Sequence, residues 1–88
     1  MITISFNKIY VNTVAFEGAE IIFSYGDKWY RMKWDNVPDR FKQLYVLYLR
    51  LQGIEVPSSL QDYIVSTLNV EDLQIELDLS LAEEMEKV

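Results

Sequence analysis

The stretch that decides the fold is residues 9–34, IYVNTVAFEGAEIIFSYGDKWYRMKW. It is rich in β-branched and aromatic residues, which favour pleated strands. Two glycine-containing pairs, Glu17-Gly18 and Gly26-Asp27, interrupt it, and glycine tolerates the positive φ that tight hairpin turns require. The pattern therefore predicts three antiparallel strands, at residues 9–16, 19–25 and 28–34.

The positions of the two turns also predict the register. Side chains on a strand alternate between faces, and directly paired residues share a face. A turn at Gly26-Asp27 sets Glu20 opposite Lys33, and a turn at Glu17-Gly18 sets Val14 opposite Ile21. One face is then almost wholly apolar, with Asn12 as its main exception, and carries Tyr10, Val14, Ile21, Phe23, Tyr30 and Met32. The other face is expected to meet solvent and carries Thr13, Ala15, Glu20, Ile22, Ser24, Trp29, Arg31 and Lys33.

A further strand is predicted at residues 2–6, which would make a β-meander of about four strands. A two-residue turn at Asn7-Lys8 would place the apolar side chains of this strand on the polar face. A three-residue loop from Asn7 to Ile9 pairs Phe6 with Tyr10 and directs those side chains inward. We prefer the longer loop because each apolar side chain that it buries contributes about 1.5–3 kcal/mol.

Two helices are expected behind the meander, at residues 38–52 and about 58–69. Pro38 suits a first helical turn, with Asp35 or Asn36 as the cap and Gly53 as the stop. The first helix is apolar nearly all round, so one side should pack on the sheet and the other on the second helix or on a second subunit. In the second helix, Ser58 and Gln61 match a capping box, and the apolar stripe is Leu60, Tyr63, Ile64, Thr67 and Leu68.

The C-terminal segment, residues 70–88, is predicted to form an acidic strand and a short helix. Apolar residues alternate strictly from Leu73 to Leu81, which favours a strand near residues 72–79. Ser80 and Glu83 match a second capping box, which predicts the short helix. The sequence thus indicates one α+β domain, residues 1–88, made of the meander (2–34), two helices (38–69) and the acidic end (70–88).

The composition argues against catalysis and against metal or cofactor binding. The 88 residues include no cysteine and no histidine, so the commonest general base, the commonest zinc ligand and any disulfide are excluded. No phosphate-cradling glycine pattern is present. We therefore expect a non-enzyme without cofactor or metal. No apolar run approaches a membrane span or a signal-peptide core, so we expect a cytoplasmic protein, in host cytoplasm if it is viral.

Charge is distributed unevenly along the chain. Net charge is −6, yet residues 1–70 hold seven acidic and seven basic residues, so the whole imbalance lies in residues 71–88. Six of the eight basic residues lie between positions 28 and 50. For the acidic end we rank three interpretations: a solvated face first, pairing with the basic segment second, and mimicry of nucleic acid third. The candidate acidic residues are Glu76, Asp78, Glu83 and Glu84.

Three functions remain open. The favoured one is a protein–protein interaction module that uses Trp29, Ile22, Arg31, Lys33 and the acidic end. A small virus- or mobile-element-encoded inhibitor or adaptor acting on a host protein has this character. The second is single-stranded nucleic-acid binding through Trp29, Arg31 and Lys33, because an aromatic with flanking cations on a sheet suits such a ligand. The third is a structural subunit that forms a homodimer through the 38–52 helix.

Overall fold

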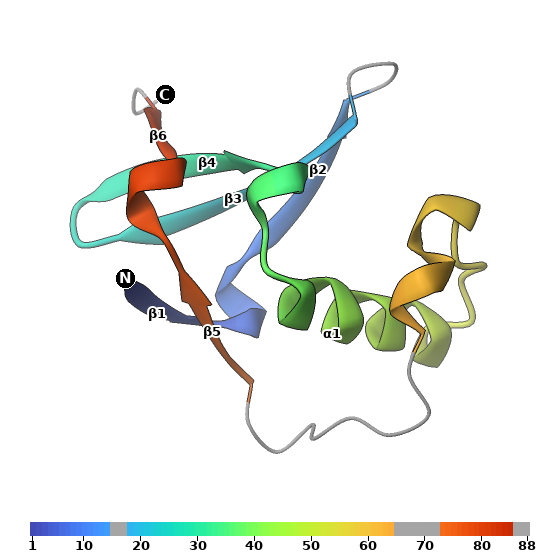
Figure 1. The fold of residues 1–88 in the computed structure, drawn as a ribbon. Coiled ribbons are helices and arrows are strands. Elements are labelled where there is room, and N and C mark those ends of the chain that lie inside the picture. Colours follow the sequence, from blue (N-terminus) through green and yellow to red (C-terminus); the bar gives the residue numbers. More distant parts are fainter. Residues whose placement is uncertain (15–17, 65–72, 86–88) are drawn as a thin grey trace.

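The computed structural model describes residues 1–14, 18–64 and 73–85, as a mixed α+β fold with antiparallel sheets and one α-helix (Figure 1). The strands are β1 Ile2–Ser5, β2 Tyr10–Val14, β3 Gly18–Tyr25, β4 Lys28–Lys33, β5 Gln74–Leu77 and β6 Glu83–Met85, and the helix is α1 Asp39–Leu51. Short 3-10 turns are η1 Phe6–Lys8, η2 Trp34–Asn36, η3 Ser58–Tyr63 and η4 Leu79–Leu81. Within the described part of the chain, no helix is long and apolar enough to cross a bilayer.

The hairpin between β3 and β4 has the predicted register. Glu20 pairs with Lys33, Ile21 with Met32, and Phe23 with Tyr30. Gly26 has a φ of +62° in the turn, a conformation that side chains with a Cβ rarely adopt. Ile21, Phe23 and Met32 are almost completely buried, which confirms the predicted inner face of these two strands.

The predicted register between β2 and β3 is wrong by three residues. Ile21 pairs with Val11 instead of Val14, and Gly18 is a strand residue paired with Val14 instead of part of a two-residue turn; residues 15–17 lie outside the described residues. An odd shift moves every side chain of β2 to the opposite face. The shift directs Asn12, the polar exception on the predicted inner face, outward. It also leaves the hydroxyl-bearing ring of Tyr10 exposed instead of buried.

The predicted four-strand meander is also wrong, because β1 does not pair with β2. β1 pairs with β5 in a separate two-stranded sheet, with Ile2 opposite Leu77 and Ile4 opposite Ile75. These four side chains are buried, and their polar neighbours on both strands face away. The match of two alternating strands explains the pairing. The fourth strand of the larger sheet is β6, so its order is β2-β3-β4-β6.

The first predicted helix is confirmed, with one correction to its start. Pro38 is the N-cap of α1, without a side-chain capping bond, and the predicted caps Asp35 and Asn36 belong to the turn η2. The predicted stop is confirmed: Gly53 has a φ of +73°, and its N–H donates to the Arg50 carbonyl at 3.1 Å.

The second predicted helix is wrong over its described residues. Residues 58–63 form the 3-10 turn η3 with Pro57 as N-cap, and the Ser58–Gln61 capping box is not formed. Instead the Gln61 Nε2 donates to the Val56 carbonyl at 3.4 Å. This short 3-10 element buries Leu60 and leaves Ile64 exposed. Residues 65–69 of this prediction lie outside the described residues.

The C-terminal strand is confirmed, as β5, but the short helix after it is wrong over its described residues, and residues 86–88 lie outside them. The Asp78 carboxylate accepts hydrogen bonds from the Ser80 backbone N–H at 3.0 Å and from its hydroxyl at 2.6 Å. This capping starts the 3-10 turn η4 two residues earlier than the predicted cap, Ser80. After this turn, Glu83–Met85 runs as β6 beside β4.

The main core lies where the inner face of the larger sheet, the β1–β5 sheet and α1 meet (Figure 1). Phe41 on α1 is central, with its ring centroid 5.2 Å from that of Phe6 and 6.2 Å from that of Trp34. A smaller cluster joins the other side of α1 to the segment around η3, through Val46, Leu49, Val56 and Leu60. The helix is thus covered on two sides, as its apolar character predicts.

Candidate partner-binding face of the sheet

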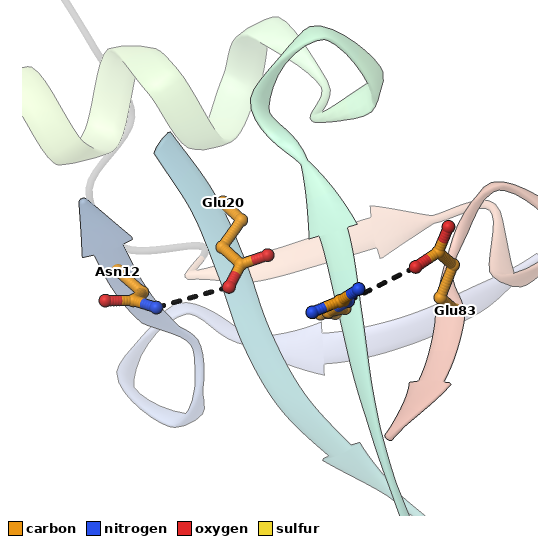
Figure 2. Close-up of polar contacts among 4 residues, drawn as sticks. Asn12, Glu20 and Glu83 are labelled. Atoms are coloured by element: carbon orange, nitrogen blue, oxygen red, sulfur yellow. Dashed lines mark hydrogen bonds and ion pairs between the residues drawn. The ribbon is translucent and has the colours of Figure 1, made fainter. Parts of the chain in front are cut away.

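The side of the β2-β3-β4-β6 sheet that points away from the core is the candidate site, and we call it the outer face. The strand pairings set its side chains in rows across the sheet, because paired residues share a face. One row runs Tyr10, Ile22, Arg31, Glu83, and the next runs Ser24, Trp29, Met85. Asn12, Glu20 and Lys33 form the third row. Figure 2 shows polar contacts on this face.

The outer face carries large apolar side chains that remain accessible. Tyr10 is 59% exposed and Trp29 is 37% exposed, whereas Ile22 and Met85 are half-buried between their neighbours. These four residues lie on the four different strands of the sheet, and Met85 directly opposes Trp29. Rigid aromatic side chains held on a sheet lose little conformational freedom on contact, so they are suited to anchor a partner.

The charges of the outer face cancel one another. The Arg31 Nε lies 3.2 Å from the Glu83 Oε2, and the Asn12 Nδ2 donates to the Glu20 Oε1 at 3.2 Å (Figure 2). Glu20 stands opposite Lys33 as predicted, but no ion pair joins the two. Among the described residues of the outer face, the two cations Arg31 and Lys33 balance the two carboxylates Glu20 and Glu83.

The acidic residues near the C-terminal end lie in different parts of the fold. Glu83 pairs with Arg31, and on the opposite side of the sheet the Glu84 Oε2 lies 3.6 Å from the Lys28 Nζ. For these two residues the structure shows pairing with the basic segment, the second of the three interpretations. Glu76 is exposed on β5, opposite Thr3, and so belongs to the other sheet.

Asp78 serves the turn before β6. Hydrogen bonds from the Ser80 hydroxyl and backbone N–H hold the pKa of its carboxyl below its ordinary value of 3.8. The sequence-predicted candidates therefore separate: Trp29, Ile22, Arg31, Lys33 and Glu83 share the outer face, and Glu76, Asp78 and Glu84 do not.

Two outer-face residues, Tyr10 and Met85, were missed from the sequence. Tyr10 was assigned to the inner face by the wrong register, and the misplaced Asn12 was the signal that could have corrected it. Met85 had no signal, because a capping box suggested a helix at that position. A third unexpected residue is Lys42, which is buried on α1 with its Nζ 5.5 Å from the Trp34 ring centroid and 5.3 Å from that of Tyr63. These cation–π contacts tie η2 and η3 to the helix.

An open groove of about 900 Å³ borders the outer face. Glu20, Arg31 and Lys33 line one part of it, and the rest is largely apolar, with Trp34, Tyr45, Leu49, Ile54 and Leu60. A partner that covers the Lys33 end of the outer face therefore also meets apolar side chains of η2, α1 and the segment up to η3. Groups of three or more acidic side chains that could hold a metal ion are not found in residues 1–14, 18–64 and 73–85.

Comparison with protein-family models, curated proteins and solved structures finds no match for this chain.

Proposed function

We propose that the protein is a non-catalytic protein–protein interaction module, an inhibitor or adaptor that binds its partner through the outer face. The observation that carries the proposal is the set of accessible apolar side chains in two neighbouring rows of the outer face, with Tyr10 at 59% and Trp29 at 37% exposure, beside the ion pair between Arg31 and Glu83. Exposed aromatics on a face whose described charges balance suit a protein surface, because such anchors contribute most of the free energy of protein association.

The same observation argues against single-stranded nucleic acid as the ligand. Binding of a polyanion depends on cations that neutralise phosphates. The Arg31 guanidinium already pairs with Glu83, and the Lys28 ammonium with Glu84. The two carboxylates also have a role within the fold, which weakens the interpretation of the acidic end as a nucleic-acid mimic.

The experiment is affinity purification from cells that naturally contain the protein, with wild type and two single variants, Trp29→Ala and Tyr10→Ala. The matched control is Tyr25→Ala, because Tyr25 is 46% exposed and points to the opposite side of the same sheet. We expect Trp29→Ala to weaken binding of the captured protein by about 2 kcal/mol, a roughly 30-fold change. Equal capture by wild type and by both outer-face variants would contradict the proposal, and a shift of single-stranded DNA at about 50 mM salt would favour the alternative ligand.

A second candidate function is a homodimer through α1. Tyr48 is 47% exposed and Leu51 is 77% exposed, and a spacing of three residues places them side by side on the helix. Light scattering of wild type and of Leu51→Lys at tens of micromolar separates the two functions. A wild-type dimer that the variant disrupts would support this candidate, and a monomeric wild type would exclude it.

A further inference from the structure

The strand β6 completes the larger sheet with three residues in the described part of the chain, and ion pairs join both of its sides to β4. Arg31 pairs across the strands with Glu83, and Trp29 with Met85. Because successive side chains alternate, Glu83 lies on the outer face beside Arg31, whereas Glu84 lies on the opposite side beside Lys28. The acidic end that sets the net charge of the chain is therefore used, in part, to fasten a strand.

This attachment of β6, the outermost strand of the sheet, is weak. The side chains of both ion pairs are 51–64% exposed, so water and salt screen the attraction. Three residues also offer few backbone hydrogen bonds, and Glu83 and Glu84 are both exposed while Met85 is half-buried. Short segments with little buried apolar surface open locally at low free-energy cost.

The composition of β4 matches that of an edge strand. Its six residues, Lys28–Lys33, include three cations, and natural edge strands carry such charges, lysine above all, against unwanted pairing. β6 supplies the charges that make pairing with this edge favourable. The edge of β4 thus discriminates by charge: an acidic segment can pair with it, and a basic one is repelled.

We infer that the β4 edge is a strand-docking site for an extended segment of the partner protein, in which two consecutive acidic residues precede a large apolar residue, and that β6 occupies this site in the free chain. The partner segment would add a strand along β4, with one acid beside Arg31, the next beside Lys28 and the apolar side chain against Trp29. This inference rests on the proposed function, since it states how the partner engages the sheet.

The test uses the full chain and a blocked synthetic peptide, Ser-Leu-Ala-Glu-Glu-Met, which has the sequence of residues 80–85. In the variant E83K/E84K the internal strand is repelled by Arg31 and Lys28. We expect the peptide to bind this variant about tenfold more tightly than wild type, as for a site that is free in about 10% of wild-type molecules. NMR titration, with shifts that concentrate on β4, measures the weak affinities. The peptide Ser-Leu-Ala-Lys-Lys-Met should not bind.

A charge exchange makes the test specific to the β4 edge. The variant K28E/R31E should bind the Lys-Lys peptide and reject the Glu-Glu peptide. The combination K28E/R31E/E83K/E84K restores both internal ion pairs, so it should reject both peptides as wild type does. If E83K/E84K loses its far-UV circular dichroism, the neutral variant E83Q/E84Q replaces it. We then expect a smaller but measurable increase in peptide affinity over wild type.

Equal affinity of the Glu-Glu peptide for wild type and for a folded β6 variant, or no preference between the two peptides, would overturn the inference. Lys28 lies on the side of the sheet opposite Trp29, so it tests strand docking without touching the outer-face anchors. Loss of partner capture by Trp29→Ala but not by K28E would keep the proposed function and reject the docked strand. If the Glu-Glu peptide binds as expected but Trp29→Ala has no effect on partner capture, the docking site on β4 is kept and the proposed function of the outer face is rejected.

Discussion

Replacement of Phe41 tests whether one helical residue joins the parts of this fold. The side chain is 1% exposed, and its ring centroid lies 5.2 Å from Phe6, 6.2 Å from Trp34 and 6.2 Å from Tyr45. Phe41→Ala should lower the free energy of unfolding by about 3–5 kcal/mol, through lost burial and a residual cavity. The free energy of unfolding of a domain of this size is about 4–13 kcal/mol, so this variant is expected to be largely unfolded or close to it.

Phe41→Leu gives the quantitative measurement. It retains an apolar side chain but loses three ring contacts, each worth about 0.5–1.5 kcal/mol beyond burial, so we expect the free energy of unfolding to fall by about 1.5–4.5 kcal/mol. With a urea slope of about 1–1.5 kcal/mol/M, the midpoint of unfolding followed by circular dichroism should fall by about 1–4.5 M. The control is Tyr48→Leu, which loses one ring contact at an exposed position. A shift for Phe41→Leu no larger than that of the control would refute the central role of Phe41.

Two further predictions concern charge. Both side chains of the Arg31–Glu83 pair are exposed, so a double-mutant cycle with Arg31→Ala and Glu83→Ala should give a coupling free energy of about 0.2–1 kcal/mol that decreases as salt is added. A coupling free energy that salt does not change would contradict a screened surface pair. Burial, and then the nearby Tyr48, raises the pKa of the Tyr45 phenol above its ordinary value of 10.0. The phenol therefore ionises at lower pH in the unfolded chain than in the folded one, so the stability that depends on the neutral phenol is fully present below pH 10.0 and is lost as the pH rises through the raised pKa. Urea unfolding at a series of pH values should show this loss in wild type and less of it in Tyr45→Phe. The same dependence of stability on pH in both proteins would refute the prediction.

Much of the candidate site was predictable, because it depends on one local hairpin. A two-residue turn fixes the β3–β4 register, and that register alone places Ile22, Trp29, Arg31 and Lys33 on the outer face. The predicted turn between β2 and β3 was wrong, so the register of these strands depends on which side chains of β2 are buried and which are exposed. There the exposure of Tyr10 was missed, because a tyrosine suits either a core or a surface by its apolar ring and its hydroxyl.

The sequence by itself determined the elements whose signals lie within a few residues: the β3–β4 hairpin, the helix α1 between Pro38 and Gly53, and the alternating strand β5. Only the tertiary structure decided which strands meet across the length of the chain. Ile2 pairs with Leu77 and Arg31 with Glu83, and no local pattern specifies a partner some fifty or seventy residues away. Such pairs are selected by the burial and charge matching that the whole assembled fold makes possible, because loop closure alone prefers no partner among them.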